Sequence, residues 1–102
     1  MREVIRAITH PVRASMLQEV SEGPRTVTEL SRRLGVSPAR VRYHAARLER
    51  LRMVDIDRRT RPLTCRQGAA VGTLSGPTMK VVTITARDGA TISLPLDSLT
   101  RR

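Results

Sequence analysis

Four arginines and a tyrosine lie close together in the segment from Ser37 to Leu51. If this segment is a helix, at about 100° per residue, its outer face holds Ala39, Arg40, Arg42, Tyr43, Ala46, Arg47 and Arg50. Guanidinium groups bind phosphates and guanine edges through paired hydrogen bonds, and alanines let a ligand approach the backbone. The pattern predicts a helix whose outer face enters the major groove of DNA. The alternative is a solvated cationic helix.

The opposite face of this segment holds the residues that would fix the arginines in place. Its apolar stripe consists of Val41, Ala45 and Leu48, with His44 and Leu51 at the edges. Ser37 is a suitable N-cap, and Pro38 suits the first helical position. We therefore expect a helix over residues 38–51.

A shorter helix is predicted immediately before it. Thr26 and Glu29 fit a capping box, and Leu30 and Leu34 are spaced to form a buried seam. Gly35 then ends the helix, because glycine readily adopts a positive φ. A short helix, a turn containing glycine and a second capped helix together predict a helix-turn-helix.

The charge of the chain is concentrated near these helices. The 102 residues carry a formal charge of +10, and between Ser31 and Arg66 eleven arginines stand against three carboxylates. Such a patch favours a polyanionic partner, although a GC-rich genome would also favour arginine. With no Trp or Phe and a single Tyr, the core must be aliphatic.

Several classes of function find no support in the sequence. Cys65 is the only cysteine, and with only His10 and His44 beside it we expect no metal site, no cofactor and a minor place for redox chemistry. No catalytic constellation is visible, so we expect no enzyme. Without a long apolar run or a signal-peptide pattern, we expect no membrane association and a cytoplasmic, nucleoid-associated protein.

Two helices, residues 2–9 and 11–20, are predicted at the N-terminus, separated where His10 precedes a proline. We expect His10 to be a capping or surface residue and His44 to be packed and hydrogen-bonded. For Arg13, a solvated side chain or a local ion pair is favoured over a phosphate contact.

After Leu51 the apolar period changes from helical to alternating. Residues 53–57 and 63–66 predict two strands around a basic turn with Arg58, Arg59 and Arg61. A basic hairpin after a recognition helix is typical of the wing of a winged helix, whose tip would contact phosphates or the minor groove. A solvated charged turn is the alternative.

Residues 8–58, from H-P-V-R-A-S-M-L through the second capped helix to M-V-D, resemble winged-helix repressors of the ArsR type. The resemblance implies a homodimeric transcriptional regulator in which Pro38, Ala39, Arg40, Arg42 and Tyr43 face the major groove. The chain departs from that pattern in three ways. It lacks the cysteine pair of metal-sensing members in residues 27–34. It has Arg52 where the family has glycine, so we expect the helix end to close differently. Its tail is β-like rather than helical.

The tail is predicted to contain a hairpin. Residues 68–78 are rich in small residues and are interpreted as a linker with room for a short strand. Residues 79–86 and 90–96 would pair around a three-residue loop that ends in Gly89, which opposes Val82 to Leu94 and Ile84 to Ile92. The apolar face of this hairpin must pack on the helices or on a second chain, because a lone hairpin is marginal in water.

The sequence therefore predicts an α+β fold with a winged helix-turn-helix domain over 1–67, a linker over 68–78 and a β-hairpin extension over 79–102. We expect residues 79–96 to contribute to the interface of a homodimer or to brace the helices that form it, and the N-terminal helix with Val4, Ile5 and Ile8 is the other candidate surface. The predicted function is that of a sequence-specific, dimeric regulator of transcription, in the form of a repressor, bound to double-stranded DNA. A weakly specific architectural protein and a winged-helix protein-interaction module are the alternatives. The predicted DNA-binding residues are Ser37, Pro38, Ala39, Arg40, Arg42, Tyr43, Arg47, Arg50, Arg58, Arg59 and Arg61.

Overall fold

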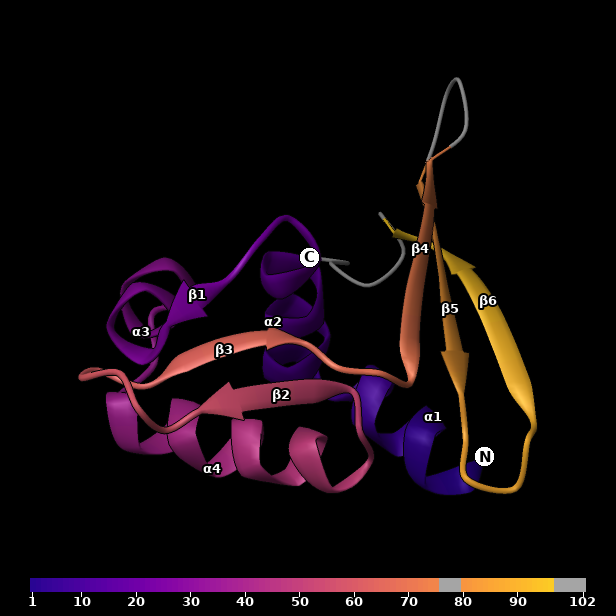
Figure 1. Ribbon diagram of the computed structural model, residues 1–102, viewed down its shortest axis with the longest axis horizontal. Coiled ribbons are helices and arrows are strands. Elements are labelled where there is room, and N and C mark those ends of the chain that lie inside the picture. The colour runs from indigo at the N-terminus through magenta and orange to yellow at the C-terminus, as the bar shows by residue number, and fades with distance from the viewer. Residues whose placement is uncertain (76–79, 97–102) are drawn as a thin grey trace.

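The computed structural model, which describes residues 1–75 and 80–96, contains four helices and two small antiparallel sheets (Figure 1). The helices are α1 (Arg2–Thr9), α2 (Pro11–Ser21), α3 (Val27–Leu34) and α4 (Pro38–Arg50). The strands are β1 (Arg25–Thr26), β2 (Val54–Asp57), β3 (Thr64–Gln67), β4 (Val71–Ser75), β5 (Lys80–Thr85) and β6 (Thr91–Pro95). The first sheet has the order β1-β3-β2, and the second has the order β4-β5-β6.

The caps at both ends of α3 and at the start of α4 are those that the sequence predicts. Thr26 Oγ1 accepts a hydrogen bond from the Glu29 backbone N–H (3.1 Å), and Glu29 Oε1 accepts one from the Thr26 N–H (2.9 Å). Gly35 closes α3 in the left-handed conformation, with φ 68°. Ser37 Oγ then accepts from the Arg40 N–H at 3.2 Å, which caps α4. These local features fix where α3 begins and ends and where α4 begins.

The first sheet closes over the helices with one apolar face. Val54 and Ile56 of β2 are buried while Asp55 between them is exposed, as the predicted alternation requires. Ile56 lies opposite Cys65 of β3, and the Cys65 side chain has no exposed surface. Burial raises the pKa of the Cys65 thiol to about 11, which keeps it protonated and unreactive at neutral pH.

The second sheet begins inside the stretch interpreted as a linker, because residues 71–75 form β4 and pair with β5. Between β5 and β6, Val82 lies opposite Leu94 and Ile84 opposite Ile92, the register that the three-residue loop predicts. Gly89 has φ 88° in that loop. Met79, expected at the start of the hairpin, lies outside the described residues.

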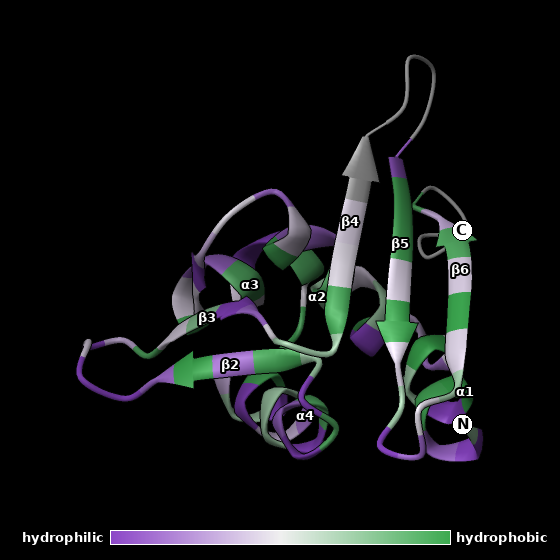
Figure 2. Cartoon of the chain, turned by 45° about the vertical axis from the view of Figure 1, so that its right-hand side comes forward, coloured by the Kyte–Doolittle hydropathy of each residue, from purple (hydrophilic) through white to green (hydrophobic). Residues whose placement is uncertain are grey.

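The apolar face of the second sheet packs on the helices of the same chain. Val82 and Ile84 belong to one buried cluster with Val4 and Ala7 of α1. In Figure 2, hydrophobic and more polar residues alternate along β5 and β6, as expected for strands with one buried face. The hydrophobic core is therefore continuous from α4 to the second sheet. The sequence left open whether this apolar face packs on the helices or on a second chain, and in the structure it packs on the chain's own helices.

The end of α4 corrects one expectation. Arg52 was expected to make this helix close differently from a glycine-terminated one, yet Arg52 itself adopts the left-handed conformation, with φ 61°. The Met53 N–H donates to the Leu48 carbonyl (3.0 Å) and the Arg52 N–H to the Glu49 carbonyl (2.9 Å), the bonds of a Schellman motif. The need to satisfy these carbonyls outweighs the steric cost of a side chain at this position.

Gly68 connects this helix end to the second sheet. Its N–H donates to the Met53 carbonyl at 3.0 Å, and the Ala70 N–H donates to the Arg52 carbonyl at 2.9 Å. A Cβ at position 68 would overlap the Arg52 carbonyl oxygen and would lie 2.7 Å from the carbonyl carbon of Met53. Only glycine therefore allows the two backbones to approach this closely.

We predict that Gly68→Ala lowers the free energy of unfolding by about 1–3 kcal/mol, since the added methyl group meets rigid backbone rather than a flexible side chain. Gly72→Ala in β4 is the matched control, because a Cβ at position 72 meets no atom within 4 Å. Urea unfolding of both variants measures the difference. Equal stability of the two variants would contradict the close approach at Gly68.

Candidate nucleic-acid interface

The outer face of α4 is exposed along its whole length. Each predicted contact residue from Ser37 to Arg50 is exposed, and the inner residues Val41, His44, Ala45 and Leu48 are buried. The ring of Tyr43 is 56% exposed, and the Arg47 guanidinium lies over it, 5.5 Å from its centroid. No salt bridge joins an arginine of this face to any carboxylate among the described residues. The face thus carries unneutralised positive charge.

His44 anchors the inner side of α4 as a packed, hydrogen-bonded histidine, as predicted. Arg13 Nε donates to His44 Nδ1 at 3.3 Å, so this nitrogen must be unprotonated. Burial lowers the pKa of His44 to about 4, with further lowering by His10 and by the nearby arginines. The imidazole is therefore neutral at pH 7, which suits a ring beneath a cationic surface.

His10 occupies the expected cap position, but its side-chain contact was not foreseen, and Arg13 differs from the expectation. His10 is the residue between α1 and α2, but its side chain makes no capping hydrogen bond; its ring packs on His44 with centroids 4.6 Å apart. Arg13 is half-buried and donates to His44, and it forms no salt bridge with a described carboxylate. The contact joins α2 to α4 across 31 positions, a separation that local sequence patterns do not reveal.

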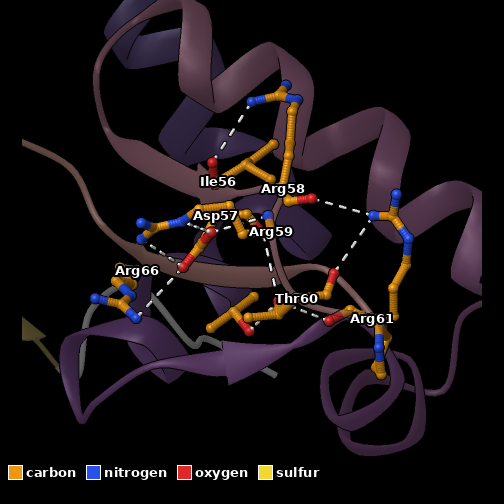
Figure 3. A network of polar contacts seen from close by, with 9 residues as sticks. Ile56, Asp57, Arg58, Arg59, Thr60, Arg61 and Arg66 are labelled. Atoms are coloured by element: carbon orange, nitrogen blue, oxygen red, sulfur yellow. Dashed lines mark hydrogen bonds and ion pairs between the residues drawn. The ribbon is translucent and has the colours of Figure 1, made fainter.

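Arg58, Arg59 and Arg61 lie together at the tip of the β2–β3 hairpin, where each has bonds within the chain (Figure 3). Both terminal nitrogens of Arg58 donate to Glu49 of α4, at 2.8 and 2.7 Å. Arg59 donates to both carboxylate oxygens of Asp57, at 3.0 and 3.2 Å. Arg61 donates to the Arg58 carbonyl at 3.1 Å. The sequence reasoning missed these partners.

These bonds affect the charge at the tip of the hairpin and differ among the three arginines. The pair with Arg58 lowers the pKa of Glu49, and the bonds from Arg59 lower the pKa of Asp57 to about 2. Both carboxylates are therefore ionised at neutral pH and cancel part of the positive charge at the tip. The Arg59 side chain is nevertheless 89% exposed, so it remains accessible to a phosphate.

The domain that carries this surface is now recognisable. Residues 8–57 match a family model described as a helix-turn-helix domain. Residues 8–57 are a helix-turn-helix domain. Neither a curated protein nor a solved structure matches the chain. A helix-turn-helix domain points to DNA binding and to regulation of transcription.

Two further features of the described residues bear on the partners of the helix-turn-helix domain. Within residues 1–75 and 80–96, no three His, Cys, Asp or Glu side chains lie close enough to hold a metal ion. No helix in those residues is long and apolar enough to cross a membrane.

The structure also brings arginines from outside the helix-turn-helix domain next to α4. Arg6 of α1 and Arg87, after β5, line a cleft together with Arg47 and Arg50. Sequence reasoning missed both residues, because neither lies in a segment with a basic pattern.

We predict that stability falls by about 2 kcal/mol between pH 7 and pH 5 through His44 alone. Its pKa is lowered from 6.5 to about 4 by folding, so the unfolded chain binds the proton first and stability is lost as the pH falls through this window. Urea unfolding at both pH values measures the slope. His44→Gln should flatten it.

His10→Gln is the companion variant, because the pKa of His10 is also lowered by burial and by nearby arginines. The chain has no third histidine, so the double variant should keep only the small slope near pH 5 that comes from carboxylates with lowered pKa values, such as Glu49. A slope as steep as that of the wild type in the double variant would contradict the assignment to histidine.

Proposed function

We propose that this protein is a sequence-specific regulator of transcription that binds double-stranded DNA through α4, and that it acts as a repressor. The unpaired arginine face of α4 is the observation that supports the proposal most. Phosphates and guanine edges are the ligands that such a face suits. Occupancy of a promoter is sufficient for repression.

The contacts in this proposal divide by position along α4. Base contacts concentrate near the N-terminal end of a recognition helix, which here holds Pro38, Ala39, Arg40, Arg42 and Tyr43. Arg47 and Arg50 lie nearer the other end, where a helix of this length passes over the DNA backbone. We assign base reading to the first group and phosphate contact to the second.

In the same proposal, the β2–β3 hairpin is the wing of an ArsR-type winged helix. Arg59 and Arg61 would contact phosphates or the minor groove, since both are exposed and Arg61 has no carboxylate partner among the described residues. Arg58 would hold the wing against α4 through Glu49 and contribute less to binding. The protein would act on the nucleoid in the cytoplasm, without a cofactor and without enzymatic activity.

We predict that Arg40→Ala and Arg42→Ala each weaken binding to the preferred site by about 1–3 kcal/mol and relax the preference at one base position. A preferred site is first selected from random duplexes, and affinities for that site and for random DNA are then compared by fluorescence anisotropy. Equal weakening on both DNAs would show that the side chain contacts phosphate only.

Arg59→Ala serves as the comparison in this experiment, because a phosphate contact should weaken binding to all sequences alike. It should also reduce the slope of log affinity against log salt by about 0.9. A wild-type specificity ratio near one would instead support the architectural alternative, and failure to bind any duplex would support the protein-interaction module.

We also propose that the protein binds DNA as a homodimer. A single recognition helix reads few base pairs, whereas two copies about 34–36 Å apart read a two-fold symmetric site. On α1, Ile5 is 43% exposed and is the apolar side chain available for such a contact, since Val4 is buried.

Sedimentation velocity at micromolar concentration should give a dimer, and Ile5→Asp should shift it towards monomer. Binding to a duplex with two half-sites should then fall more than binding to a single half-site. A monomer that binds one half-site with the full affinity would contradict this proposal.

A further inference from the structure

A basic cleft of about 680 Å³ lies where α1, the start of α2, the C-terminal half of α4 and the turn after β5 meet. Its charged lining comes from Arg6, Arg13, Arg47, Arg50 and Arg87, with Glu3 as the carboxylate among the lining residues. These residues come from segments as far apart in the sequence as α1 and the β5–β6 turn. The fold therefore gathers isolated arginines into one concave surface.

The positive charge of the cleft is not cancelled within the described chain. None of its five arginines forms a salt bridge with a described carboxylate. Arg13 donates to the neutral His44, and Arg87 donates to the Arg50 carbonyl at 2.6 Å. Elsewhere on this chain, Arg25, Arg33, Arg58, Arg59 and Arg66 all have carboxylate partners. The cleft thus gathers five arginines around one carboxylate, Glu3, and none of the five is held in a salt bridge among the described residues.

The contacts that position the walls of the cleft do not pair its arginines with carboxylates. The Arg87 bond ties the β5–β6 turn to the end of α4, and the N-terminal ammonium lies 3.7 Å from Asp88 in the same turn. His10 also lines the cleft, and its Nδ1 is buried with no hydrogen-bond partner among the described residues. A preorganised wall with an unsatisfied polar atom suits a bound ligand better than solvent alone.

We propose that this cleft binds phosphate groups. Its volume is within the range of about 300–1,000 Å³ typical of small-molecule sites, and several guanidinium groups around one space suit the many acceptor oxygens of phosphate chains. Two sources share this chemistry: the DNA backbone next to α4, and a free polyphosphate or nucleoside polyphosphate. In the second case the ligand competes with DNA, because Arg47 and Arg50 also belong to the outer face of α4.

The free-anion source is tested with inorganic triphosphate, titrated into the full chain by isothermal calorimetry at low salt. Saturable binding at one site per chain is expected, with a loss of about tenfold or more in Arg6→Ala. Arg2→Ala is the matched control, because it removes the same charge from the same helix without lining the cleft. Glu3→Gln should change the affinity in the opposite direction and tighten binding several-fold, which a purely structural effect would not do.

The DNA source is tested with the same variants on duplex DNA. If a backbone phosphate occupies the cleft, Arg6→Ala and Arg87→Ala each reduce the salt slope by about 0.9 while Arg2→Ala does not, and triphosphate binds without saturation. Thermal melting of each variant checks that the fold is retained, and Arg87→Lys keeps the charge if Arg87→Ala unfolds.

The proposal is overturned if Arg6→Ala and a folded Arg87→Ala behave as Arg2→Ala does with both triphosphate and DNA. The free-anion arm does not rest on the proposed function. Triphosphate binding that depends on Arg6, in a protein that binds no duplex, would leave the cleft assigned and remove the DNA-binding role.

Discussion

Burial of the inner face of α4 is the constraint on which the functional surface depends. Val41 and Leu48 have no exposed surface, and Ala45 has almost none. Because successive helical residues advance by about 100°, fixing this narrow stripe against α2 and α3 also fixes the outward direction of the arginines. The surface charge is therefore positioned by apolar packing, and the caps at Ser37 and Arg52 set how much of the helix is presented. A change in the core beneath α4 would rotate the whole charged face.

A second constraint acts at the end of this helix, where two backbones meet at Gly68. The bonds from Gly68 and Ala70 to Met53 and Arg52 fix the direction in which the chain leaves the first sheet. The second sheet then covers α1 with Val82 and Ile84 and brings Arg87 to the end of α4. A short chain with an aliphatic core buries too little apolar surface to stabilise two separate units, and one continuous core avoids this problem.

The sequence predicted the features that short-range chemistry determines. The capping box at Thr26, the left-handed Gly35, the buried stripe of α4 and the register around Gly89 all follow from residues within a few positions of each other. Other features depend on the tertiary fold, so no local pattern predicts them. They are the partners of Arg13 and Arg58 and the placement of Arg6 and Arg87 in one cleft. Arg52 shows the reverse case. Its residue type argues against a positive φ, but the carbonyls at the helix end and the contact with Gly68 require one.

The bond between Arg87 and α4 also bears on which side chains of this helix can be exchanged. Arg87 holds the main-chain carbonyl of residue 50, not its side chain, and Arg58 holds Glu49, which lies beside the outer face. Both braces would thus persist if the outward side chains were exchanged. Substitutions on the outer face of α4 would therefore change the surface that is presented to a ligand and leave both bonds in place. The scaffold separates the side chains that hold the helix from those that form its charged surface.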